Sequence, residues 1–263
     1  MNVVDEIFST TRPGQPAIIS DSQTIDYPQL DELAGHCARA LGPQLPPPPA
    51  RIGLRCADGV DYIALALGIV RLGHCLVPVP GELTRGEREF LAARAALAAV
   101  VVAGARAADG GGPPVPEFAV AALHPPRAGW EEEFRALGPA FIRFSSGTTG
   151  ERKGVVLSHR RLRERVIAAN ANMRIGRGDR VLWVLPMSHH FAVSIMLYLW
   201  HGAACVIGGP NLPGDLLKRA ARTAASVYYA APYHYQLLAE CAGSGGPPRY
   251  AHGWSRIEVP RPP

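Results

Sequence analysis

The amino-acid sequence predicts an α/β protein in which helices cross over between the strands of a sheet. Short apolar, β-branched runs such as Val155–Leu157 alternate with longer stretches of helical character along the 263 residues. This alternation is typical of α/β folds. The 48% hydrophobic content is sufficient for a large core in a chain of this length. The proline-rich breaks at 46–49 and 110–116 are expected to be surface loops rather than domain linkers.

The individual elements follow from apolar periodicity and from the breaks between apolar runs. Strands are expected near residues 17–20, 51–56, 75–79, 98–103, 117–121, 140–144, 154–158, 180–185, 203–208 and 226–229. Helices are expected near residues 28–41, 59–72, 84–96, 159–172, 190–200, 213–224 and 232–241. This alternation alone is compatible with several doubly wound folds.

Two of these regions carry additional signals. Residues 23–30 predict a strand that ends in a turn, with Pro28 at the first position of the following helix, where proline is tolerated. Residues 181–207 are the most apolar stretch, and polar or helix-breaking residues such as Pro186 and His189 interrupt it. This stretch is therefore predicted to be a buried strand–helix–strand unit rather than a membrane span.

The formal net charge of +5 does not indicate nucleic-acid binding. The arginines are dispersed, and in the one local cluster, at 160–165, they alternate with Leu162 and Glu164. Such a pattern predicts a solvated helix face. The sequence contains no RNA-binding or helix-turn-helix signature, so no nucleic-acid partner is expected.

The cysteines and the N-terminus predict a cytoplasmic location. The five cysteines are odd in number and widely spaced, and the chain has no Cys-x-x-Cys motif. Free thiols in a reducing compartment are therefore expected rather than disulfides or zinc ligands. The first residues do not combine a basic region with an apolar one, so no signal peptide is expected.

Residues 145–154, Ser-Ser-Gly-Thr-Thr-Gly-Glu-Arg-Lys-Gly, are the most informative stretch of the chain. Glycines allow tight turns and let backbone N–H groups approach an anion. The hydroxyl groups add neutral donors, and Lys153 adds a positive charge that suits a phosphate. With an apolar run before it and a β-branched run after it, the segment predicts a polyphosphate-binding loop between two strands.

Two other interpretations of this segment were considered. A flexible Gly/Ser/Thr surface loop does not explain Lys153, because only Lys153 and Lys218 are lysines among the 27 basic residues. A Walker-type loop needs glycine, four residues and then Gly-Lys-Ser/Thr at the start of a helix. Here Gly147 and Gly150 are separated by two residues and a strand-like run follows, so the Walker interpretation fails.

The segment resembles the phosphate-binding signature of the adenylate-forming enzymes, the superfamily of acyl-CoA synthetases, peptide-synthetase adenylation domains and luciferases. Arg152 stands where that signature usually has proline, which either loosens the turn or adds a second cation. Four further segments resemble the family in the expected order, at residues 23–30, 70–79, 185–191 and 227–232. The resemblance covers about residues 1–240 and implies a layered α/β N-terminal domain.

The resemblance also implies cofactors and a reaction. A carboxylate attacks the α-phosphate of ATP, pyrophosphate leaves, and the thiol of coenzyme A or of a carrier phosphopantetheine then displaces AMP from the acyl-adenylate. Fixed donors and Mg²⁺ would stabilise the charge on the departing phosphates. Thr148, Thr149, Gly150 and Lys153 would contact the phosphates, and Ser145 would approach Mg²⁺. The complete set of nucleotide-binding residues implied by the resemblance is Ser145, Ser146, Gly147, Thr148, Thr149, Gly150, Lys153 and Gly154.

The segment at 185–191 is implied to place His189 beside the acid-binding pocket, whereas His190 is assigned to the core or the surface. A metal site made by these two histidines is not expected, because adjacent side chains on a helix or strand point in different directions. Amino-acid-activating members carry an aspartate after phenylalanine here, but this chain has Ala192 after Phe191. A fatty or aromatic carboxylic acid is therefore the expected small-molecule substrate.

Later segments of the family are not found: Tyr-Gly-x-Thr-Glu, Tyr-x-Thr-Gly-Asp, and the small C-terminal domain with its catalytic lysine. Residues 1–242 are therefore expected to be a truncated AMP-binding domain, and residues 243–263 a disordered tail. The strand near 226–229 would then be left as an unpaired sheet edge.

On this expectation the chain is the front part of an acid–thiol ligase, is inactive in isolation, and contains no assigned catalytic residue. Two alternatives stay open. One is a catalytically dead fragment that at most binds nucleotide or a partner protein. The other is one half of a split enzyme completed by a C-terminal polypeptide.

Overall fold

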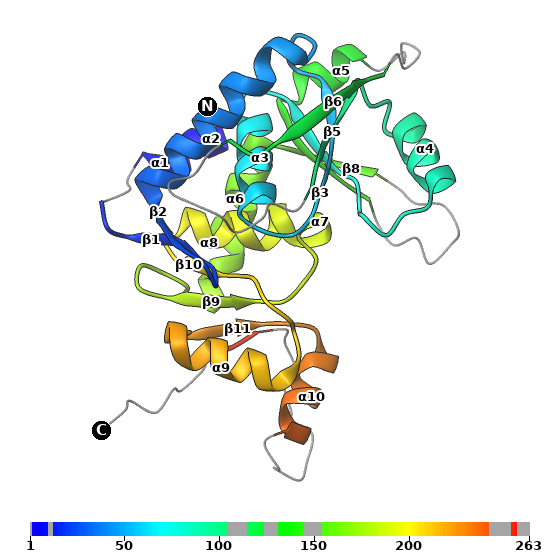
Figure 1. Ribbon diagram of the computed structural model, residues 1–263. Coiled ribbons are helices and arrows are strands. Elements are labelled where there is room, and N and C mark those ends of the chain that lie inside the picture. The colour runs from blue at the N-terminus through cyan, green and yellow to red at the C-terminus, as the bar shows by residue number, and fades with distance from the viewer. Residues whose placement is uncertain are drawn as a thin grey trace.

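The computed structural model describes residues 2–9, 13–104, 115–123, 131–144, 154–241 and 254–256. These residues form two mixed β-sheets, each with six described strands, and helices that lie between and outside the sheets (Figure 1). The α/β class predicted from the alternation of elements is confirmed.

Sheet A has the strand order β12-β11-β9-β10-β1-β2. Its strands are β1 (Pro16–Ile19), β2 (Thr24–Asp26), β9 (Arg180–Trp183), β10 (Ala204–Val206), β11 (Val227–Tyr229) and β12 (Trp254–Arg256). The four inner strands are parallel, while β2 and β12 pair antiparallel at the two sides. The carboxyl ends of the inner strands therefore lie along one edge of the sheet.

Sheet B has the order β6-β5-β3-β4-β7-β8. Its strands are β3 (Arg51–Cys56), β4 (Cys75–Pro78), β5 (Ala99–Ala103), β6 (Phe118–Ala122), β7 (Pro139–Phe144) and β8 (Gly154–Ser158). Again the four inner strands are parallel and the two outer ones antiparallel. The parallel strands β3 and β4 are buried along most of their length, as expected for strands covered on both faces.

A layer of helices separates the two sheets. It contains α1 (Val3–Phe8), α2 (Tyr27–Leu41), α3 (Val60–Arg71), α6 (His159–Met173) and α8 (Met196–Trp200), and the short 3₁₀ turn η1 (Gly42–Gln44) follows α2. One hydrophobic core runs through this layer, and it includes Ile18 from sheet A and Leu54 from sheet B.

The contact between α2 and α3 depends on a small residue. A Cβ atom added at Gly68 would lie 2.9 Å from the Cβ of Cys37 and 3.2 Å from the carbonyl oxygen of Ala34. These distances are shorter than van der Waals contact, so only glycine lets the two helices approach this closely. At its start, α2 has a capping box in which Asp26 and Gln29 exchange hydrogen bonds of 2.9 Å.

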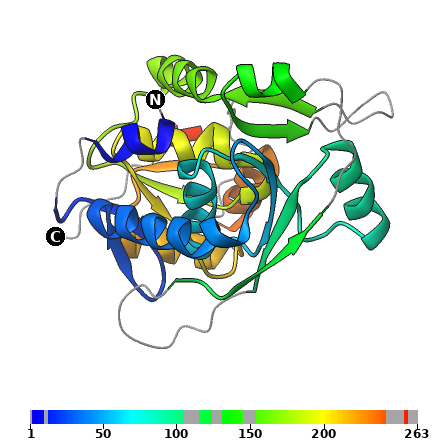
Figure 2. The same ribbon diagram turned by 90° about the horizontal axis from the view of Figure 1, so that it is seen from above.

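Helices also cover the outer faces. A second, smaller core lies between sheet B and the helices α4 (Arg85–Arg94) and α5 (Glu131–Ala136), and it contains Val77, Leu91 and Phe134. Figure 2 shows α4 standing away from the body of the domain. Helices α9 (Pro213–Thr223) and α10 (Pro232–Cys241) lie beyond sheet A, on the side away from sheet B (Figure 1).

Several elements were not expected from the sequence. Helices α1 and α5 are six residues each and the turn η1 is three, too short for a clear apolar period. The strand β12 was also not expected, and it pairs antiparallel with β11 from Tyr229↔Trp254 to Val227↔Arg256. The expectations of a disordered 243–263 segment and of an unpaired strand at 227–229 are therefore wrong for Trp254–Arg256 and for β11. The other residues of 243–263 lie outside the described ones.

Candidate functional site

The predicted phosphate-binding segment joins two paired strands. Residues 145–153, which include Ser145, Ser146, Gly147, Thr148, Thr149, Gly150 and Lys153, lie outside the described residues. Their flanks are described: β7 ends at Phe144, β8 begins at Gly154, and these two residues face each other across the antiparallel pair. The segment is thus the connection of a β-hairpin, as the sequence predicts for a strand–loop–strand unit. A helix does not follow it, which agrees with the rejection of a Walker-type loop.

Gly154 is the one predicted nucleotide-binding residue that the structure describes. A Cβ atom at this position would lie 3.1 Å from Cε1 of Phe144 and 3.4 Å from Cγ2 of Ile142. The missing side chain therefore leaves room for the Phe144 ring beside the strand. The glycine has a packing role at the base of the connection.

A second segment begins at the carboxyl end of β9, in sheet A. The chain passes from Trp183 through Pro186 into the short helix α7 (Met187–His190), then into one π-helical turn, η2 (Phe191–Ile195), and finally into α8. The sequence analysis expected a continuous helix here. Single π turns inside helices are rare and occur frequently at functional sites, because the wider turn redirects the neighbouring side chains.

Asp58 connects this segment to sheet B. It lies just beyond the carboxyl end of β3, and its Oδ1 atom accepts a hydrogen bond of 3.0 Å from the backbone N–H of Met187. The N–H of Gly59 in turn points to Sδ of Met187 at 3.4 Å. Burial raises the pKa of Asp58, the Met187 N–H counteracts this, and Glu82 raises the pKa further. A carboxylate from one sheet therefore binds the first turn of a helix that leaves the other sheet.

Glu82 makes a second connection to α7. It follows the carboxyl end of β4, and its Oε1 atom lies 3.4 Å from Nε2 of His189. About half of the His189 side chain is exposed, so the ring is accessible from solvent. The structure thus places the predicted pocket histidine between the carboxyl ends of β3 and β4 in sheet B and that of β9 in sheet A. Ligands of open α/β sheets typically bind beyond such strand ends.

His190 points elsewhere, into an aromatic cluster that we define as Trp183, His190, Tyr198 and Tyr229. Trp183 and Tyr229 are stacked, with ring centroids 5.9 Å apart and an interplanar angle of 15°. The His190 ring stands edge-on to both, at 6.0 Å from Trp183 and 6.2 Å from Tyr229. The two adjacent histidines therefore diverge, as expected for neighbours on a helix.

The environment keeps His190 uncharged. Burial lowers its pKa to about 4, and the nearby positive charges of Arg143 and His189 act in the same direction. At neutral pH the imidazole is therefore neutral, with one nitrogen that donates and one that accepts hydrogen bonds. Arg143 lies near the end of β7, at the base of the hairpin.

Sequence reasoning missed Asp58, Glu82 and Trp183. Each lies at or just after the carboxyl end of an inner parallel strand: β3, β4 and β9 respectively. A search for polar or aromatic residues at the predicted strand ends could have found them, because ligands of open α/β sheets bind beyond the carboxyl ends of the strands.

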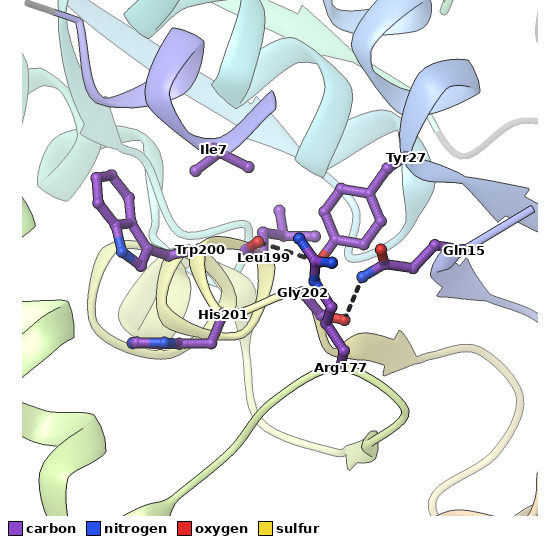
Figure 3. A pocket seen from close by; sticks show the side chains of 8 residues that line it. All are labelled: Ile7, Gln15, Tyr27, Arg177, Leu199, Trp200, His201 and Gly202. Carbon is purple, nitrogen blue, oxygen red and sulfur yellow. Dashed lines mark hydrogen bonds between the residues drawn. The ribbon is translucent and has the colours of Figure 1, made fainter. Parts of the chain in front are cut away.

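A small cavity at the opposite edge of sheet A is a different feature. It has a volume of about 50 Å³ and is lined by residues that include Gln15, Tyr27, Arg177 and Gly202 (Figure 3). Gln15 precedes β1 and Gly202 precedes β10, so the cavity lies at the amino ends of these strands. A space of this size holds one or two water molecules and is too small for a nucleotide.

Other classes of site were searched for in the described part of the chain. It contains no group of three or more His, Cys, Asp or Glu side chains placed to hold a metal ion. Cys37, Cys56, Cys75 and Cys205 are free thiols, in agreement with the sequence prediction, and burial raises the pKa of Cys37 and Cys56 to about 12. None of the described helices has both the length and the apolar character to cross a bilayer.

The amino-acid sequence of the chain is similar to those of known proteins. The chain is 27% identical over 228 residues to "Novobiocin biosynthesis protein H" of Streptomyces niveus, covering 81% of this chain and 38% of that protein. It is 27% identical over 212 residues to "Long-chain-fatty-acid--CoA ligase FadD13" of Mycobacterium tuberculosis, covering 72% of this chain and 41% of that protein. The chain thus spans less than half the length of these curated relatives.

Solved structures show the same fold. The inhibitor-bound N-terminal domain of FACL13 from Mycobacterium tuberculosis superimposes with a TM-score of 0.74 and 20% identity, covering 95% of this chain and 68% of that one. ATP-bound MatB from Rhodopseudomonas palustris gives a TM-score of 0.68 and 23% identity, covering 90% and 50%. The family model for the AMP-binding enzyme matches residues 6–253, nearly the whole chain. The chain therefore belongs to the family of AMP-binding, adenylate-forming enzymes.

Proposed function

We propose that this chain forms the nucleotide- and acid-binding part of an ATP-dependent acid–thiol ligase. The ligase would activate an acyl or aryl carboxylic acid as an acyl-adenylate and transfer the acyl group to the thiol of coenzyme A or of a carrier phosphopantetheine. One observation carries the proposal. The Phe144–Gly154 pair holds the two residues that flank the Ser/Thr/Gly/Lys segment opposite each other, at the carboxyl end of β7.

The residues of the segment suit the leaving group of such a reaction. When carboxylate oxygen attacks the α-phosphate, negative charge grows on the departing pyrophosphate. Backbone N–H groups, the hydroxyls of Thr148 and Thr149, and the ammonium of Lys153 would stabilise that charge. Groups that are in position before the reaction lower its entropic cost.

The cofactors follow from the same residues. ATP would supply the adenylyl group, and the backbone N–H groups and hydroxyls of the segment are donors that suit its phosphates. Magnesium would bind mainly through the phosphate oxygens of ATP, with the Ser145 hydroxyl as the proposed protein contact.

The names of similar proteins support the class of reaction. One relative is called a fatty-acid–CoA ligase, and a structural neighbour was solved with ATP bound. His189, accessible beside Glu82, is the proposed histidine of the acid pocket. A cytoplasmic location belongs to the same proposal, because the free thiols are those of a reducing compartment.

The experiment that tests this proposal measures ATP binding by calorimetry with the full chain. Lys153→Ala should weaken binding by about 1.5–3 kcal/mol, since it removes a charge-assisted contact to phosphate. Lys218→Ala is the matched control, because it removes the other lysine of the chain, on α9, and should leave binding unchanged. Absence of ATP binding, or equal losses in the two variants, would refute the proposal.

Acid-dependent exchange of pyrophosphate into ATP then tests whether the described chain also performs the first chemical step. Exchange requires the carboxylic acid, whereas ATP binding alone does not. A chain that binds ATP but shows no exchange with any acid would be a binding module of this family rather than a complete catalyst.

A further inference from the structure

Two buried polar atoms in the aromatic cluster lack hydrogen-bond partners among the described residues. They are Nε1 of Trp183 and Nδ1 of His190. Trp183 is only 4% exposed, and its indole N–H can act only as a donor. An unpaired buried polar group is costly, so nearly all such groups in folded proteins have a partner. Both atoms belong to rings that contact each other, with centroids 6.0 Å apart.

The position of these atoms points to a ligand. Trp183 is the last residue of β9, and His190 is the last residue of α7, next to the π turn. Both therefore lie at the carboxyl edge of sheet A, where the Trp183 ring is part of the main hydrophobic core and His190 adjoins the exposed His189. Tyr229, the third ring, comes from the end of β11 at the same edge and is only partly buried.

We propose that this aromatic cluster selects an aromatic carboxylic acid that carries a ring hydroxyl group. The inference rests on the proposed function, because it assigns the acid that the ligase would activate. The rings of Trp183, Tyr229 and His190 pack on one another in stacked and edge-on geometries, and a further flat ring packs favourably against such a cluster. Aromatic contacts thus favour an aryl acid over a fatty acid, two classes that the sequence leaves open.

The hydroxyl group follows from the hydrogen-bonding capacity of the two atoms. A hydroxyl has one donor hydrogen and two acceptor lone pairs. It can accept from the Trp183 N–H and, at the same time, either donate to Nδ1 of a neutral His190 or accept from it. It therefore fits both tautomers of the imidazole. A ring amino group is a poor acceptor and would leave the indole N–H unpaired, and an unsubstituted ring would leave both atoms unpaired.

The test uses the full chain and acyl-sulfamoyladenosines, which are unreactive mimics of acyl-adenylates. Affinities for the benzoyl, the three isomeric hydroxybenzoyl, the aminobenzoyl and the octanoyl derivatives are measured by calorimetry. One hydroxybenzoyl isomer should bind at least about tenfold more tightly than the benzoyl compound, because it satisfies two buried groups. The aminobenzoyl and octanoyl compounds should show no such gain.

Trp183→Phe removes the N–H and keeps an aromatic ring, so it should reduce the ratio of hydroxybenzoyl to benzoyl affinity to about one. His190→Phe provides the same comparison at the second atom, and thermal melts of both variants confirm folding. Trp200→Phe is the matched control, because Trp200 lines the small cavity at the opposite edge, and it should retain the preference.

The outcomes separate this inference from the proposed function. If benzoyl or octanoyl derivatives bind best, or if Trp183→Phe keeps the hydroxyl preference, the inference is wrong although the chain still binds acyl-adenylates. If none of the derivatives binds and ATP does not bind, the proposed function itself is wrong.

Discussion

Asp58 and Met187 connect the two sheets at the candidate site: Oδ1 of Asp58 accepts a hydrogen bond of 3.0 Å from the backbone N–H of Met187. Asp58 follows β3 in sheet B, and Met187 begins the helix that leaves β9 in sheet A. Because α7 carries both histidines, this one bond links their position to the opposite sheet.

Two variants of Asp58 distinguish the contribution of its hydrogen bond to stability from that of its charge. Asp58→Ala leaves the Met187 N–H without this acceptor and should lower the free energy of unfolding by about 1–3 kcal/mol. Asp58→Asn keeps an acceptor oxygen and removes a charge that burial disfavours, so its stability at neutral pH should equal or exceed that of the wild type. Urea denaturation measures both. Equal stability of the two variants would contradict a role for this hydrogen bond.

His190 should make stability depend on pH. Its pKa is about 4 in the folded protein and about 6.5 in the unfolded chain, so between these values the unfolded chain binds more protons. The contribution of neutral His190 to the free energy of unfolding is therefore fully present at neutral pH. It is lost as the pH falls from about 6.5 towards 4. His190→Phe should make the curve of unfolding free energy against pH flatter in this range.

Two other residues act in the same range and must stay in place during this measurement. Burial lowers the pKa of His74 to about 4, and it also lowers the pKa of His159. The variant should therefore flatten the curve only in part. A slope that is the same for His190→Phe and the wild type would show that His190 is not buried in its neutral form.

Gly68 should be intolerant of even one added methyl group. In Gly68→Ala the new Cβ would meet Cys37 Cβ at 2.9 Å, and it would also approach the α2 backbone at Ala38 N (3.1 Å). Overpacking against the backbone cannot relax easily and should lower the free energy of unfolding, measured by chemical denaturation, by about 1–3 kcal/mol.

Gly86→Ala is the matched control, because no atom lies within 4 Å of the position of its added Cβ on α4. Alanine is the better helix former there and should stabilise by up to about 1 kcal/mol. Equal effects at the two sites would contradict the close helix contact.

The strand β12 should protect the side of sheet A. Deleting residues 243–263 removes β12 and exposes the backbone N–H and C=O groups of β11, which favours pairing with other chains. Light scattering should then show association of the shortened chain. Deleting only residues 257–263 keeps β12 and should leave the association state of the full chain unchanged. If both deletions behave alike, the β11–β12 pairing has no protective role.

The sequence by itself determined the elements with strong local signals. The apolar runs around residues 145–153 predicted β7 and β8, and the structure has both, within a residue of the expected bounds. Pro28 and the strand before it predicted the start of α2. These features depend on residues within about one or two turns of one another, where periodicity, capping and proline geometry act. The family could be predicted from the sequence for the same reason, because its signature is a contiguous segment.

Only the tertiary structure decided what surrounds the site. Asp58 and Met187 are 129 residues apart, and Glu82 and His189 are 107 residues apart, so neither contact has a local signal. The aromatic cluster joins the ends of β9, α7 and β11, and its unpaired nitrogens exist only because these ends converge. The strand β12 is likewise defined by its partner β11 rather than by alternation in its three residues. Hydrogen bonds and ring contacts of this kind form when the ends of parallel strands bring together residues that are far apart in the sequence. Local sequence propensity does not predict such contacts.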